Sequence, residues 1–384
     1  MIDGKLRVFS LRRDQAGSLL TFTKGIAILP IFFHHFARST WLARGMAPPA
    51  LLQWNFTSAG MVFGALTSSA GAGRYYEVFL RLMARYGYMG VHLFVLASGL
   101  GLALGTPMAV STGAFLKHRM IRIIPPFWMA VALLDLWETA LGHPFAIRDV
   151  VERLFLLTTF DEKRFFNADS PLWYLSLAFQ LYLIFLPLRR LIVRFGLVSL
   201  LPLAAIGFVA RQLAALPAIM EWNQYFGHVL ALNWLAVFGL GIWIGDRLRR
   251  DGEVALPGWA VTATALASFS LFLLSNAWKA AYPIHDTVIG VLIAVVAFLA
   301  WRMMDGTYPA RAVAAVGAIS FPLYLYHRPV VSKLLNLWCR RIDPGALPPA
   351  GLGLALAVVL IVFLLLARRA LRVTPKIRAL VLGV

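Results

Sequence analysis

The feature that most limits the fold of this chain is a succession of apolar segments, each about 20 residues long. A helix of that length, rising about 1.5 Å per residue, crosses the apolar layer of a membrane. We count about ten such segments and expect each to be a membrane-spanning helix. They lie at about residues 19–38, 87–106, 122–141, 171–190, 196–214, 227–247, 257–276, 285–303, 312–336 and 350–369.

Composition agrees with this interpretation. Of 384 residues, 60% are hydrophobic and 14% charged, and the mean hydropathy is +0.76. Soluble domains carry about 25% charged residues, so an ordinary globular enzyme, a disordered chain and a secreted disulfide scaffold are excluded. Continuous apolar runs also disfavour a transmembrane barrel, and the single cysteine, Cys339, cannot form an intrachain disulfide. The expected fold is all-α: one polytopic transmembrane helical bundle over residues 1–384.

The net charge of +19 does not indicate a nucleic-acid-binding protein, because the basic residues stand in short clusters between apolar segments. Such clusters are typical of cytoplasmic loops beside anionic lipid. No cleavable signal peptide is evident, and the first apolar segment, near Leu19, is interpreted as a membrane helix. We expect a multi-pass protein of the plasma membrane, the inner membrane of a bacterium, with both termini cytoplasmic. An extra span at 48–66 would reverse the orientation of every later segment, so segment 39–86 is left open.

The first apolar segment contains three ionisable groups, Lys24, His34 and His35. Lys24 and His35 are eleven residues apart, which places them on one helix face, about 16 Å apart along the axis. Pro30 lies between them and can loosen the helix. A neutral histidine can take a proton from a hydroxyl, and a lysine can hold a phosphate. Alternatively, Lys24 extends to the lipid headgroups and His35 bonds another helix.

Four further motifs occur in order along the chain: GYMGVHLFVLASGLGLALG, FLKHRMIRIIPPFW, PLWYLSLAFQLYLIFLPL and SFPLYLYHRPVV. Together with the first segment they resemble the acyltransferase 3 family of membrane-bound acyl-CoA-dependent O-acyltransferases. The family has an Arg, ten residues and a His in its first helix, a pair taken as essential for catalysis; Lys24 replaces the Arg and His35 matches the His, so the resemblance implies that Lys24 and His35 are the catalytic pair. His92 replaces an Asp of the second helix, and Ala178 and Phe179 replace a pair of Glu residues.

The resemblance implies transfer of an acyl group, most often acetyl, from acyl-CoA (acetyl-CoA) to a hydroxyl of a glycan or related acceptor. His35 would be the general base, or would carry the acyl group as an acyl-histidine. The coenzyme A thioester would meet Lys24, Arg119 and Arg122, whose three-residue spacing puts the two arginines on one face. The implied acceptor-side or tunnel-lining residues are Ser98, Trp173, Gln180, Tyr182, Tyr324 and His327.

Each match also has a structural alternative. Ser98 and Gly99 form a small-residue pair that favours close helix packing. Arg119 and Arg122 suit topology anchors at a cytoplasmic helix start.

Trp173 and Tyr182 suit packing or interface aromatics. Tyr324 and His327 share a helix face, but the adjacent Arg328 suits an interfacial position. No metal site is expected, because the other histidines lack paired spacing: His143, His228 and His285.

Two other functions remain open. A transporter or flippase of a glycan, lipid or organic anion would also use buried histidines and basic residues. An inactive relative acting as a structural partner would explain the missing acidic pair of the fourth helix. The sequence leaves the acceptor, the acyl chain length and the formation of a homo-oligomer open.

Overall fold

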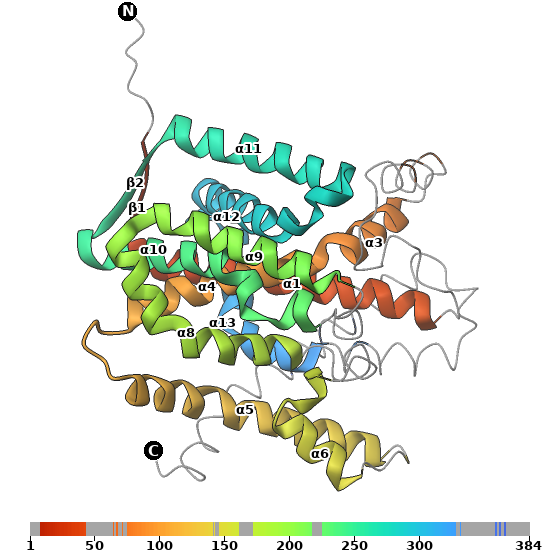
Figure 1. The fold of residues 1–384 in the computed structure, drawn as a ribbon. Helices are drawn as coiled ribbons and strands as arrows, with labels where there is room; N and C mark the ends of the chain where they lie inside the picture. Colours follow the sequence, from red (N-terminus) through yellow and green to blue (C-terminus); the bar gives the residue numbers. More distant parts are fainter. Residues whose placement is uncertain are drawn as a thin grey trace, which may run out of the picture.

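The computed structural model describes residues 8–43, 64, 67, 71, 75–140, 142, 146–160, 172–216, 225–327, 331, 358, 361 and 365. Most of these residues are helical (Figure 1). The long elements are α1 Ala16–Ala43, α3 Tyr75–Tyr86, α4 Gly90–Gly105, α5 Thr112–Ala140, α6 Ile147–Leu154, α8 Trp173–Phe195, α9 Leu200–Ala214, α10 Leu235–Asp251, α11 Gly258–Ala277, α12 His285–Met304 and α13 Tyr308–Ala318, with strands β1 Val8–Arg12 and β2 Glu253–Pro257. Short helical turns are Arg13–Gln15, Gly87–Met89, Leu157–Phe160, Gly196–Ser199, Tyr225–Val229, Ala231–Trp234 and Lys279–Ile284.

The prediction of an all-α, multi-pass membrane bundle is confirmed. Within the described ranges, six helical stretches are long and apolar enough to cross a membrane, and one of them, Trp173–Ala214, contains both α8 and α9. Each of the first eight predicted segments coincides with a helix, although α10 is shorter than a typical span at 17 residues. The ninth begins in α13 and continues through helical residues 320–327. The tenth segment and the segment left open at 48–66 fall largely outside the described residues.

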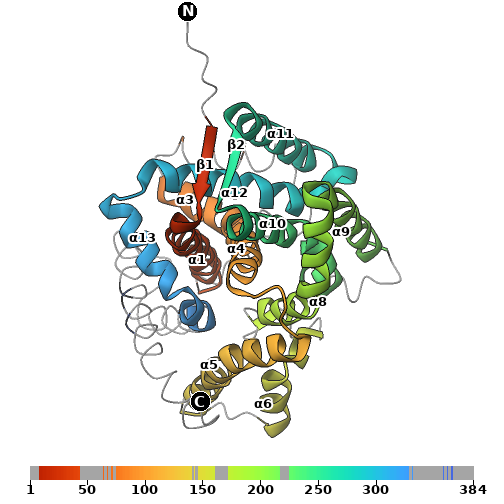
Figure 2. The same ribbon diagram turned by 90° about the vertical axis from the view of Figure 1, so that its left-hand side faces the viewer.

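The centre of the bundle is formed by α1, α4 and α10, which Figure 2 shows nearly end-on, with α8, α9, α12 and α13 around them. Glycines let these helices approach closely, as is common in membranes, where small residues replace a hydrophobic driving force. A Cβ at Gly99 of α4 would lie 2.3 Å from the carbonyl oxygen of Phe238 on α10. A Cβ at Gly317 of α13 would lie 1.7 Å from the carbonyl oxygen of Thr21 on α1. Any side chain at either glycine would therefore push the helices apart.

One end of the bundle contains a two-stranded ribbon that the sequence analysis did not predict. β1 pairs antiparallel with β2, with Leu11 opposite Val254. Gly252 ends α10 in the left-handed region, with φ of +76°, where a residue without a side chain is favoured. Arg302, near the end of α12, lies over the ring of Phe9. The ribbon thus ties the start of the chain to the connection between α10 and α11.

At the same end, arginines from α8 and α10 hold the C-terminus of α4. Arg189 donates to the carbonyl of Thr106 at 2.8 Å and to Asp246 at 2.7 Å. Both side chains of this ion pair are at most 2% exposed. Arg249 donates to the same carbonyl of Thr106. Because the C-terminus of a helix carries partial negative charge, these guanidinium groups are favourable there.

Candidate active site

The two neighbouring histidines of α1 have different surroundings. His34 is buried, and its Nδ1 donates to the carbonyl of Met83 on α3 at 3.3 Å. His35 is only partly buried, and its ring centroid lies 4.8 Å from that of His327. The structure therefore gives His34 a fixed contact between two helices and brings His35 beside a second imidazole. Of the two, His35 is better placed to meet a ligand.

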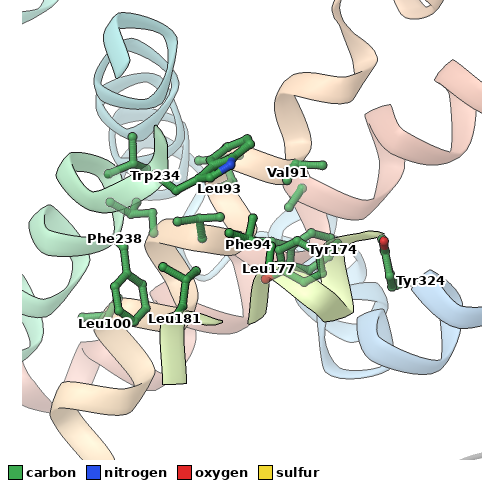
Figure 3. Packing of buried hydrophobic residues seen from close by; sticks show 14 of the residues in the cluster. Val91, Leu93, Phe94, Leu100, Tyr174, Leu177, Leu181, Trp234, Phe238 and Tyr324 are labelled. Atoms are coloured by element: carbon green, nitrogen blue, oxygen red, sulfur yellow. The ribbon is translucent and has the colours of Figure 1, made fainter. Parts of the chain in front are cut away.

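A series of aromatic and hydroxyl groups leads from this histidine pair into the bundle. Nδ1 of His327 donates to the carbonyl of Tyr324 at 2.6 Å, which in a neutral ring leaves Nε2 as the acceptor. The ring of Tyr324 lies 5.2 Å from that of Tyr174, whose hydroxyl is 3.3 Å from Oγ of Ser98. Figure 3 shows Tyr174 between Phe94 and Tyr324. Three predicted acceptor-side residues thus lie together with His35.

Tyr174 is a residue of this series that sequence reasoning missed. It stands inside the motif PLWYLSLAFQLYLIFLPL, directly after Trp173, which the resemblance had singled out. A polar hydroxyl in an apolar segment was the available signal. Both roles considered for Ser98 and Gly99, helix packing and a place in the site, are consistent with their contacts. Gly99 packs closely on α10, and Ser98 contacts Tyr174.

The three predicted donor-site cations, Lys24, Arg119 and Arg122, lie near enough for their charges to act on one another or on a common neighbour. Lys24 of α1 is partly buried, and the charge of Arg122 on α5 acts on it. Arg119, one helical turn before Arg122, donates to the hydroxyl of Thr106 at 3.4 Å. Both arginines act electrostatically on the phenol of Tyr182 from α8. Like charges repel each other at short range, so this grouping favours an anion between them.

Two other predicted residues make contacts that are structural in kind. The amide of Gln180 donates to the carbonyl of Val229 at 3.0 Å and accepts from the backbone N–H of Ala231 at 3.0 Å. It therefore satisfies backbone groups of the irregular segment before α10. Trp173 is buried, with its ring centroid 6.2 Å from that of Trp234.

A second polar cluster, not predicted from the sequence, lies at the end of the bundle opposite the ribbon. His92 of α4 donates from Nε2 to Oδ1 of Asp286 on α12 at 3.2 Å. Arg211 of α9 donates to the other carboxylate oxygen. The sequence signal for this cluster was a charged residue in each of two apolar segments, Arg211 and Asp286. Because the two residues are 75 positions apart, the sequence does not show that they pair. The described residues contain no group of three or more His, Cys, Asp or Glu that could hold a metal ion.

Comparison with known protein families gives a match over most of the chain. Residues 20–368 match the model of the acyltransferase 3 family, which is described as an acyltransferase domain. This range contains both His35 and His327, and all three predicted donor-site cations. No curated protein and no solved structure matches the chain significantly.

Proposed function

Because the chain belongs to the acyltransferase 3 family, we propose that this membrane acyltransferase moves an acyl group, most often acetyl, from acyl-CoA to a hydroxyl of a glycan or related acceptor. The observation that carries the proposal is the arrangement along α1. His35 lies beside a second imidazole, while Lys24 lies with two arginines nearer the ribbon end. A proton acceptor and an anion-binding group are thus about 16 Å apart on one helix.

The donor binds at the ribbon end. Lys24, Arg119 and Arg122 supply charge for the phosphates of coenzyme A, since hydrogen bonds between cations and phosphate are roughly twice as strong as neutral ones. The pantetheine arm then runs along α1 toward His35 and presents the thioester there. Lys24 replaces the arginine of the family motif, so it binds phosphate as a point charge rather than as a planar fork.

The chemistry takes place at His35. Its neutral imidazole takes the proton of the acceptor hydroxyl while that oxygen attacks the thioester carbonyl. The C–S bond breaks, an ester forms, and the coenzyme A thiolate takes the proton back from the imidazolium. General-base catalysis of this kind contributes about 10²–10⁴-fold, and positioning of the two substrates supplies more. His327 orients the ring of His35 or the acceptor hydroxyl.

The protein lies in the plasma membrane, the inner membrane of a bacterium, with the ribbon end and both termini in the cytoplasm. Support comes from the basic residues at that end, among them Arg189, Arg249 and Arg302, because positive charge accumulates on the cytoplasmic side. Acyl-CoA then enters from the cytoplasm, and the acceptor meets His35 nearer the outer side.

The experiment is incubation of the purified full-length protein with acetyl-CoA labelled in the acetyl group and a mixed glycan extract. We expect label in a glycan ester and an equal amount of free coenzyme A thiol. A transporter or flippase would leave the thioester intact. A protein that binds coenzyme A but releases neither product would contradict the proposed activity, and one that does not bind it would fit an inactive relative.

A further inference from the structure

We propose that the acyl acceptor carries an acidic group, a carboxylate or a phosphate, and that the Nε–Nη2 edge of Arg211 binds it. This inference rests on the proposed acyl transfer, because it names the class of substrate that meets His35. It comes from the second polar cluster, formed by His92, Asp286, Arg211 and the tyrosines beside them.

The orientation of Arg211 is fixed by Asp286. One guanidinium nitrogen, Nη1, donates to Oδ2 of Asp286, while His92 uses the other oxygen. The side chain of Arg211 is 10% exposed, and its Nε and Nη2 are buried without a hydrogen-bond partner among the described residues. These two N–H groups lie along one edge of the planar guanidinium and form the fork that binds carboxylate or phosphate through two parallel hydrogen bonds.

Charge in the cluster also favours an anion. The single negative charge of Asp286 is already matched by the charge of Arg211, and His92 bonds its other oxygen. Arg85 of α3 adds a second guanidinium, which donates a hydrogen bond to Tyr282. Arg85 and Arg211 both act electrostatically on Tyr282 and Tyr88. Burying a charged donor without a partner is costly, and an acidic ligand at Arg211 would remove that cost.

The cluster is close to the reacting end of α1. The ring centroids of His34 and Tyr88 are 6.4 Å apart, and those of Tyr88 and His92 are 6.1 Å apart. His34 is in turn the direct neighbour of His35, with ring centroids 5.0 Å apart. The donor cations lie toward the ribbon end, so an anion at Arg211 belongs to the other substrate. One molecule can then present its hydroxyl to His35 and its acidic group to Arg211.

Binding is tested with three probes on the full-length protein in lipid nanodiscs: D-glucuronate, D-glucose 6-phosphate and D-glucose. Coenzyme A is present throughout to occupy the donor cations, ionic strength is constant, and the shift of the thermal unfolding midpoint gives the dissociation constant. We expect saturable stabilisation by at least one acidic probe and none by glucose. Glucuronate would indicate a carboxylate acceptor, and glucose 6-phosphate a phosphorylated one.

Arg211→Lys keeps the charge beside Asp286 but removes the fork, so the bundle is expected to fold. This variant should raise the dissociation constant of the acidic probe about 10- to 100-fold, the range for hydrogen bonds to charged groups. Arg247→Gln, at an exposed position of α10 at the ribbon end, is the matched control and should leave it unchanged. Equal binding of glucose, or unchanged acid binding in Arg211→Lys, overturns the inference.

Transfer separates this inference from the proposed function. Labelled product from the glycan extract should be retained on an anion-exchange column, and Arg211→Lys should raise the KM for that acceptor. If the product is neutral and Arg211→Lys does not change the KM for the acceptor, the acidic acceptor is overturned, but acyl transfer remains in place. Absence of any transfer overturns the proposed function, and the probe measurements still decide whether Arg211 binds acids.

Discussion

Replacing His35 and His34 separately by glutamine distinguishes a catalytic imidazole from a structural one. Glutamine cannot accept a proton at neutral pH, but its amide N–H donates hydrogen bonds. At His34 it can replace the donation to the carbonyl of Met83. At His35, whose ring faces His327, it removes the proposed base. The same substitution is therefore expected to abolish most activity at His35 and to leave activity nearly unchanged at His34.

The expected magnitudes follow from these contacts. His35→Gln loses the general-base contribution of about 10²–10⁴ in kcat, equivalent to about 3–5 kcal/mol of activation free energy. The KM for acetyl-CoA should change little, because Lys24 is eleven residues away, about 16 Å along α1. His34→Gln should keep kcat within a few-fold, and its free energy of unfolding should fall by about 0.5–1.5 kcal/mol for each backbone hydrogen bond of the ring, to Met83 or Ala84, that glutamine does not replace.

The assay measures initial rates of labelled acetyl transfer over a range of acetyl-CoA concentrations, with size-exclusion chromatography to show that each variant is folded. A His35→Gln protein that keeps more than a tenth of the wild-type kcat would refute the assignment of the base. So would a folded His34→Gln protein that is as inactive as His35→Gln, because the hydrogen bond to Met83 would then not be the role of His34.

Three other predictions concern donor binding, stability and orientation. Lys24→Ala should raise the dissociation constant of acetyl-CoA about tenfold or more and Lys24→Arg should not, as measured by calorimetry; unchanged affinity in Lys24→Ala argues against phosphate binding. Arg189→Met should lower the free energy of unfolding by about 1.5–3 kcal/mol, because the buried carboxylate of Asp246 then keeps only Arg250 as its ion-pair partner, and adding Asp246→Leu should recover part of that loss in thermal unfolding; no recovery would contradict a buried ion pair. In a cysteine-free background, a membrane-impermeant maleimide should label Ala146→Cys in intact cells and Ala255→Cys only after permeabilisation, both positions being exposed; the reverse pattern would invert the proposed orientation.

The helices were predictable because the bilayer leaves a chain few alternatives. Backbone groups inside it must bond within their own segment, so length and hydropathy indicate a helix. The ribbon of Val8–Arg12 and Glu253–Pro257 was not predictable in this way. Its strands are five residues each and far apart in sequence, and neither has a pattern that specifies the other as its partner.

Part of the site could be read from spacing and part could not. The eleven-residue interval from Lys24 to His35 fixes a shared face on any regular helix. The partners of those residues come from other segments, and helix periodicity contains no information about them. Arg211 and Asp286, 75 positions apart, meet because α9 packs against the turn Lys279–Ile284 that leads into α12. His92 was recognised as a departure from the family pattern, but its carboxylate partner required the three-dimensional arrangement.

The contacts of Thr106 limit which helices can be exchanged between this protein and other members of its family. Its carbonyl accepts hydrogen bonds from Arg189 and Arg249, and its hydroxyl accepts one from Arg119. Helices α5, α8 and α10 are therefore all bonded to the residue that ends α4. A chimera that imports α10 alone would lose the contact of Arg249 and disturb Thr106, to which Arg119, a predicted coenzyme-binding residue, is bonded. Segment exchange intended to alter the acceptor should therefore leave these four helices as a block and take its crossover points elsewhere.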